Sequence, residues 1–405
     1  MPEASRTRRA PAGVVGALVA VPLAPLLPLL LALLLALLLA WVPLRRHYTS
    51  DLTWYWAINW DHGFVRRGLC GELAALLPGG DLESSAQLWT GLAAAAATFT
   101  VALVAGLRLL RGDPVSVALG LALVVGPVGF IMLATDSRPE YLGFPALLLV
   151  VAACRAHTRG RPVAARCWLG LAGALLGAVT LASENVLFAV LPWCVVLLAA
   201  TTVGAPVAER LRLVAGFVAL PAVAAAAVVA GGRPDAAQLA ALRANARRLD
   251  GQPDQFMTFI GQDLGQSVRM VAHSGVGHRL LTMLVAAGLV LVLALLLLAC
   301  GVGREWTRLP QDPLLRLALC LPVAALVFQT ATGIDWPRWV GQLGCGALLT
   351  LTAWGLLVPD RAPARWSVGL VGRVALCFCL LALVPAVPFN IPQGHVTEFV
   401  SGRVA

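Results

Sequence analysis

Long apolar runs recur along the chain, each separated from the next by a stretch that carries arginine, proline, glycine or acidic residues. The first continuous run covers about 26–42, because Pro22, Pro25 and Pro28 interrupt the apolar residues before it. Ten further runs have or approach the roughly 20 residues that a helix needs to cross a bilayer. They cover 87–107, 114–134, 140–154, 167–183, 186–203, 211–230, 280–300, 314–334, 339–358 and 367–387. The pattern predicts an all-α, polytopic membrane protein of about eleven transmembrane helices, with 1–405 as a single transmembrane domain.

The distribution of arginine predicts how these helices are oriented. With the N-terminus in the cytoplasm, fourteen arginines fall at inner ends, and the short outer loops hold only Arg138 and Arg338. Positive charge is enriched in cytoplasmic loops, whereas long loops translocate largely regardless of charge. We therefore expect an integral protein of the cytoplasmic (plasma) membrane with a cytoplasmic N-terminus and an extracytoplasmic C-terminus.

Two long polar segments, 45–86 and 232–279, then fall on the extracytoplasmic side. Trp54, Tyr55 and Trp56 in the first favour an interfacial helix, because aromatic side chains anchor at headgroup level. The second carries two stretches with apolar residues at helical spacing. These stretches predict two amphipathic helices lying on the membrane.

Composition excludes several other classes of protein. Of the 405 residues, 59% are hydrophobic and 12% charged, against roughly 25% charged in a soluble domain. The net charge of +10 does not indicate nucleic-acid binding, because the arginines are spread among loops rather than gathered on one face.

Eight of the nine cysteines, all except Cys70, lie in apolar runs, where they act as small hydrophobes. His273 and His278 have no carboxylate or cysteine at metal spacing. No cofactor is predicted, and a divalent metal has no ligand set to support it.

The first outer loop carries charged residues that an interfacial helix does not explain. Asp51 and Asp61 lie in it, followed by His62 and by adjacent arginines, Arg66 and Arg67, between glycines. Glycine lets the backbone approach a ligand closely, and arginines offer forked donors suited to phosphate. Alternatively, the arginine pair binds anionic lipid headgroups.

Three shorter polar motifs come out on the same predicted side. They contain Arg138 and Glu140, then Glu184, then Asp335 and Arg338. Helix capping or a local ion pair would explain each motif by itself. Acidic residues at membrane level are costly, however, and are usually functional or paired. Because these acidic residues gather on the predicted extracytoplasmic side, we expect a functional site on that side of the membrane.

These features resemble the membrane-embedded C-type glycosyltransferases (GT-C). The resemblance rests on Asp51 near the end of the first span, the aromatic segment behind it, Arg138-Pro139-Glu140 opening a later helix, and the charged Glu184. Many GT-C members carry an adjacent Asp-Glu pair in the first loop, whereas here Leu52 follows Asp51. The resemblance implies transfer of a hexosyl or pentosyl group from a polyprenyl-phosphate donor to a cell-envelope glycan or lipid acceptor, at the extracytoplasmic face.

Such a transfer needs a carboxylate to take the acceptor's proton and cations to stabilise the departing phosphate. The resemblance implies Asp51 as the first candidate base and Asp61 as the second. The candidate phosphate-binding residues are His62, Arg66, Arg67, Arg138 and Arg338, with Glu140, Glu184 and Asp335 in support. The expected partners are the donor, the acceptor and membrane lipids.

Two other functions stay open on the sequence. An O-antigen-type polysaccharide polymerase or ligase would share the outer arginines but would depend more on 232–279. A lipid-linked-glycan transporter or flippase would need polar groups along a path to the cytoplasm, and the inner parts of the predicted helices carry few. ATP-driven transport is not expected, because the chain has no phosphate-binding G-x-x-x-x-G-K-[ST] loop.

Overall fold

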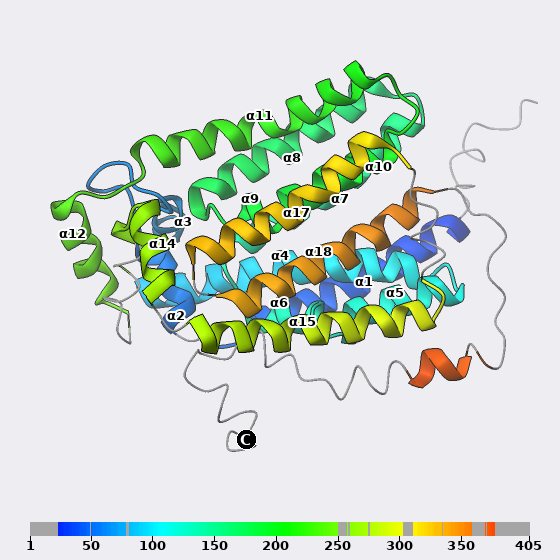
Figure 1. The fold of residues 1–405 in the computed structure, drawn as a ribbon, viewed down its shortest axis with the longest axis horizontal. Helices are drawn as coiled ribbons and strands as arrows, with labels where there is room; N and C mark the ends of the chain where they lie inside the picture. The colour runs from blue at the N-terminus through cyan, green and yellow to red at the C-terminus, as the bar shows by residue number, and fades with distance from the viewer. Residues whose placement is uncertain are drawn as a thin grey trace, which may run out of the picture.

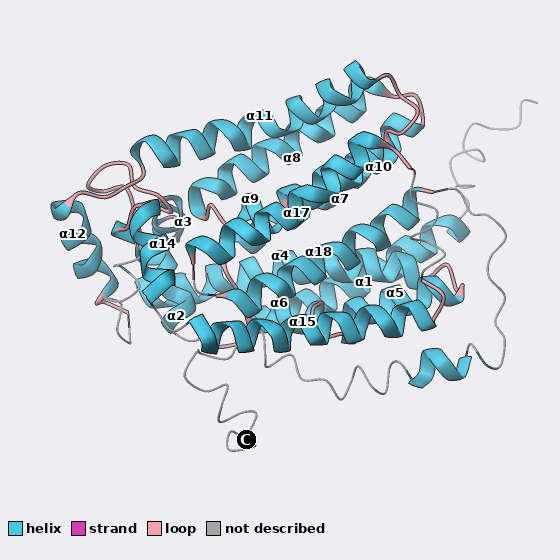
Figure 2. Cartoon of the chain, in the orientation of Figure 1, coloured by secondary structure: helices cyan, strands magenta, loops and turns pink. Residues whose placement is uncertain are grey.

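The computed structural model contains only helices and loops in the residues that it describes (Figure 2). These residues are 23–48, 50–77, 81–249, 257, 260–273, 276–302, 311–333, 335–358, 369 and 371–376. Among them, nine helical segments are long and apolar enough to cross a membrane. Figure 1 shows these segments running side by side as one bundle. The prediction of an all-α, polytopic membrane protein is confirmed.

Each of the nine segments corresponds to a predicted span. They are α1 (Leu23–Leu44), α4 (Leu82–Leu109), α5 (Pro114–Val125) with α6 (Phe130–Thr135), η2 (Pro139–Gly143) with α7 (Pro145–Thr158), α8 (Pro162–Ala182), α11 (Val207–Gly231), α15 (Val276–Ala299), α17 (Pro313–Thr332) and α18 (Trp336–Leu357). The run predicted at 186–203 forms two shorter helices, α9 (Val186–Ala189) and α10 (Leu191–Thr201). The run predicted at 367–387 lies outside the described residues, apart from 369 and 371–376.

The first span packs through small residues. Ala32, Ala36 and Ala40 recur every four residues along α1 and are buried, whereas its leucines are mostly exposed. A Cβ atom added to Gly106 of α4 would meet the Cβ of Ala32 at 3.0 Å. Small residues let membrane helices approach closely, while the leucines suit contact with lipid. The stripe on α1 therefore sets which of its faces lies against α4.

Two spans are interrupted on either side of the 136–138 segment. The helix α5 ends before Gly126, whose extended backbone (ψ 154°) turns the chain away before α6 begins. After α6, Pro139 opens a short 3-10 helix, η2, rather than a regular α-helical turn. Residues 136–138 are consequently not helical, and they lie at the end of the bundle that carries the first loop. We call this the first-loop end.

The first loop folds into short helices: α2 (Ser50–Thr53), η1 (Trp54–Ala57) and α3 (Leu69–Ala75). The side chains of Trp54, Tyr55 and Trp56 in this loop are buried. Trp56 is fully buried, donates its indole N–H to the Thr90 hydroxyl at 2.8 Å, and stacks on Trp89 of α4. A buried indole needs such a partner. The loop is thereby fixed on the end of α4.

The 232–279 segment contributes α12 (Ala236–Ala246) and α14 (Leu264–His273), in agreement with the two helices predicted there. Asp235 begins α12 as a capping box with Gln238. Both helices gather with α2 and α3 at the first-loop end (Figure 1).

The close approach of α8 to α11 depends on the absence of a side chain at Gly173. A Cβ atom at this position would lie 2.5 Å from the backbone oxygen of Phe217. We expect Gly173→Ala to lower the free energy of unfolding by about 1–3 kcal/mol through overpacking. Thermal unfolding in detergent would measure the loss. Gly170→Ala is the control, because its added Cβ would meet nothing within 4 Å. Equal stabilities of the two variants would contradict the prediction.

Candidate functional site

Arginines and carboxylates from separate parts of the chain meet at the first-loop end. The first loop, the start of η2, the segment before α9 and the starts of α15 and α18 supply them. We call this set the arginine cluster, and it consists of Arg66, Arg67, Arg138, Arg279 and Arg338 with Asp136, Glu140, Glu184 and Asp335. The motifs that the sequence places on one side are thus brought together.

Arg67 and Glu184 form the best-aligned pair. Arg67 Nε donates to Glu184 Oε2 at 3.0 Å, and Nη2 donates to Oε1 at 2.7 Å. The Arg67 guanidinium also lies 5.4 Å from the centre of the Tyr55 ring. Arg67 adopts φ +66°, a left-handed conformation that costs a non-glycine residue roughly 1–3 kcal/mol. The forked bond to Glu184 and the contact with Tyr55 hold the residue in this conformation.

Arg66 joins the first loop to the 232–279 segment. Its backbone N–H donates to Gly232 O at 2.7 Å, and its Nε donates to Ile260 O at 3.0 Å. Its Nη1 lies 4.0 Å from Glu184 Oε1. Backbone carbonyls thus occupy donors of the guanidinium that was predicted to bind phosphate.

Arg138 lies between three groups of the cluster. Its Nη1 donates to the Tyr55 hydroxyl at 2.6 Å, its Nε lies 3.3 Å from Asp136 Oδ1, and its Nη2 lies 3.9 Å from Asp335 Oδ2. The Tyr55 ring therefore contacts both Arg67 and Arg138.

Arg338 is buried beside two carboxylates and keeps unused donors. Its Nη2 lies 2.8 Å from Asp335 Oδ2, and its Nη1 lies 3.8 Å from Glu140 Oε1, too far for a hydrogen bond. The Ser183 hydroxyl donates to Glu140 Oε2 at 3.0 Å. Within the described residues, Nε and Nη1 of Arg338 and Oε1 of Glu140 are buried without a hydrogen-bond partner. Buried donors without partners are costly, so the site favours a ligand or water that accepts from Arg338.

The arginines lower the pKa values of two carboxylates in the cluster, Glu184 and Asp335. Burial opposes ionisation of Glu184, but the charge and hydrogen bonds of Arg67, together with Arg66, outweigh it and lower the pKa of Glu184 to about 2. Burial is likewise outweighed at Asp335, where Arg338, Arg138 and Arg279 lower the pKa. Five arginines against four carboxylates leave the arginine cluster cationic, which suits an anionic ligand.

The structure does not place every predicted site residue in the cluster. Asp61 is exposed, and its Oδ2 accepts from Asn59 Nδ2 at 2.5 Å. His62 is exposed, and its carbonyl accepts from Gln238 Nε2 at 2.9 Å. Within the described residues, no contact joins either side chain to the cluster. Asp51 belongs to α2, and its side chain lies outside the part of the chain that the structure describes.

Sequence reasoning did not identify Tyr55 or Arg279 as part of the site. Tyr55 was expected to anchor in the interface, yet it is buried beneath two guanidinium groups. Arg279 lies at the membrane-level start of α15 and acts electrostatically on Asp335. An arginine at the edge of an apolar run, beside a polar outer segment, was the available signal.

A metal centre would need several ligating side chains close together among the described residues. Among them, no group of three or more histidine, cysteine, aspartate or glutamate side chains lies close enough together to hold a metal ion. The carboxylates of the arginine cluster have guanidinium neighbours instead.

The bundle and its cluster define an integral membrane protein with a charged site at one end. Residues 21–250, more than half of the chain, match the model of a family described as "Uncharacterised membrane protein Rv1490". The chain belongs to this family of membrane proteins. No curated protein and no solved structure matches it. The matched residues include the first loop, Arg138, Glu140 and Glu184, whereas Asp335 and Arg338 lie beyond them.

Proposed function

We propose that the protein is a glycosyltransferase that moves a sugar from a polyprenyl-phosphate donor to a cell-envelope glycan or lipid acceptor at the extracytoplasmic face. The observation that carries this proposal is Arg338, which presents buried, unpartnered donors within a cationic cluster at the end of membrane-length helices. A phosphate on a membrane lipid has the charge and acceptor oxygens to satisfy them.

In the proposed reaction, the acceptor hydroxyl oxygen bonds to the anomeric carbon of the sugar while the bond from that carbon to the phosphate oxygen breaks. The electron pair of the broken bond goes to the phosphate, and the hydroxyl proton goes to a carboxylate base. Arg338 and Arg138 both lie beside Asp335, so they can share the charge that develops on the leaving phosphate. The candidate bases remain Asp51 and Asp61. The polyprenyl chain of the donor would lie among the lipid-facing helices.

A polysaccharide polymerase or ligase is a second candidate. The bonds from Arg66 to Gly232 and Ile260 favour it, because they join the 232–279 segment to the arginine cluster. A polymerase would take a glycan from a lipid pyrophosphate and extend it repeatedly.

Sugar transfer by the purified protein in detergent tests these functions. The assay would use a panel of radiolabelled polyprenyl-phosphate sugars with lipid-linked acceptors, and glycans on polyprenyl pyrophosphate in a parallel series. We expect one sugar to be transferred per acceptor from a monophosphate donor. A ladder of products from pyrophosphate donors would favour the polymerase. Lipid movement across vesicles without transfer would overturn the proposal and favour a flippase.

Arg338→Lys is expected to lower the kcat of transfer by about 10²-fold. Lysine keeps a positive charge beside Glu140 but loses the forked donors that suit phosphate. The kcat measured with saturating donor would show the loss. Arg316→Lys, an exposed position on α17 at the opposite end of the bundle, provides the control. An unchanged kcat in Arg338→Lys would exclude Arg338 from the donor site.

A further inference from the structure

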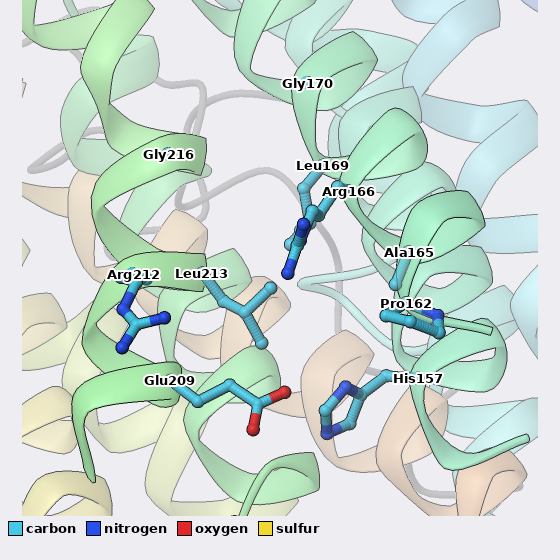
Figure 3. Close-up of a pocket in the computed structure, with 10 residues that line it drawn as sticks. All are labelled: His157, Pro162, Ala165, Arg166, Leu169, Gly170, Glu209, Arg212, Leu213 and Gly216. Atoms are coloured by element: carbon cyan, nitrogen blue, oxygen red, sulfur yellow. The ribbon is translucent and has the colours of Figure 1, made fainter. Parts of the chain in front are cut away.

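The opposite end of the bundle contains a pocket of about 420 Å³ between α7, α8 and α11 (Figure 3). Arg166 and His157 line one side, and Arg212 and Glu209 of α11 line the other. Figure 3 shows the polar ends of Arg166, His157 and Glu209 directed toward the space between the helices, with Arg212 beside Glu209 on α11.

The two arginines of the pocket are available to a ligand. Within the described residues, neither the Arg166 nor the Arg212 side chain makes a hydrogen bond or ion pair, and both are exposed. This differs from the arginine cluster, where each guanidinium lies beside a carboxylate. Two guanidinium groups from neighbouring helices can bind the oxygens of one phosphodiester. Glu209 can accept a hydrogen bond from a hydroxyl group beside that phosphate.

The position of the pocket indicates that the ligand is a lipid. Arg166 lies near the start of the span α8, and Arg212 lies near the start of the span α11, so both are at the level where a bilayer places its headgroups. Beyond the pocket, Gly216 is followed on one face of α11 by Leu220 and Val223, which are 50% and 67% exposed. Acyl chains would cover such an apolar stripe.

The space beside the pocket also fits an acyl chain. A Cβ atom added to Gly170 or Gly216 would meet nothing within 4 Å, so the pocket has open space beside these two glycines. One turn further on, Gly173 approaches the backbone of Phe217 closely and the two helices come together. The pocket thus occupies the place where α8 and α11 diverge.

We propose that this pocket binds the headgroup of an anionic diacyl phospholipid, with Arg166 and Arg212 on its phosphate and Glu209 on a headgroup hydroxyl. Basic pockets between transmembrane helices bind anionic headgroups in this way. The bound lipid would bridge α8 and α11 and stabilise the folded protein by mass action. This site is independent of the proposed sugar transfer.

Native mass spectrometry of the delipidated protein in detergent tests the proposal, with phosphatidylglycerol as the probe and phosphatidylcholine for comparison. We expect wild type to retain phosphatidylglycerol selectively and to gain thermal stability from it. Arg166→Gln/Arg212→Gln is expected to weaken that binding about 25-fold, from a fivefold loss for each arginine. The control is Arg155→Gln/Arg159→Gln, which removes the same charge from exposed positions outside the pocket.

Three results would overturn the lipid site. The first is an equal loss of binding in the control and pocket variants, which would indicate general charge attraction. The second is equal retention of the zwitterionic lipid. The third is equal stabilisation by glycerol phosphate alone, which would indicate a site for a small anion. A pocket variant that does not bind but unfolds at the same temperature as delipidated wild type would support the proposal.

Discussion

Asp51→Asn is expected to slow sugar transfer by about 10²–10⁴-fold, the usual contribution of a general base, whereas Asp61→Asn is expected to keep most of the wild-type rate. An amide cannot take the proton of the acceptor hydroxyl. Asp51 lies in α2, which continues directly into η1, where Tyr55 bonds Arg138. The backbone of α2 therefore leads into the arginine cluster. Asp61 lies on an exposed turn and bonds Asn59 instead.

Single-turnover transfer with a saturating donor would measure both rates, because product release does not limit such an experiment. Unchanged thermal unfolding would show that each variant is folded. Loss of transfer only in Asp61→Asn would assign the base to Asp61. Activity that survives both substitutions would exclude the first loop from the chemistry and direct attention to 232–279.

The membrane spans follow from the sequence because a helix satisfies its backbone hydrogen bonds internally and needs only enough apolar residues to cross. Local interruptions are harder to predict. The span expected at 186–203 breaks at Val190, two residues before Pro192, which lacks the N–H needed to continue a helix from α9. Elsewhere the extended backbone of Gly126 ends α5, and Pro139 opens the short 3-10 helix η2 ahead of α7.

The site is only partly predictable, because hydropathy does not fix how each helix is rotated about its axis. The sequence predicts that Arg138, Glu184 and Arg338 share one face. It cannot predict that Glu184 pairs with Arg67, or that Arg338 lies beside Glu140, since those pairings depend on packing between distant segments. For the same reason Tyr55, which suits an interface by composition, was not expected between two guanidinium groups.

Glu184→Gln is expected to lower the free energy of unfolding by about 3 kcal/mol, because it removes one partner from a partly buried ion pair. The substitution would leave the half-buried Arg67 and Arg66 without the carboxylate that they share. Denaturant unfolding in detergent at pH 7 would measure the loss. Glu83→Gln, an exposed position in the first turn of α4, is the matched control and is expected to change stability by less than about 0.5 kcal/mol.

Acid provides a second test of the same pair. The pKa of Glu184 is lowered from 4.5 to about 2, so its contribution is fully present above pH 4.5 and is lost as the pH falls toward 2. At about 1.4 kcal/mol per pKa unit, the shift corresponds to roughly 3 kcal/mol, which agrees with the loss expected from the substitution. Wild type should therefore lose stability over this range more steeply than Glu184→Gln. Parallel stability curves for the two proteins would show that Arg67 and Glu184 do not stabilise the first-loop end.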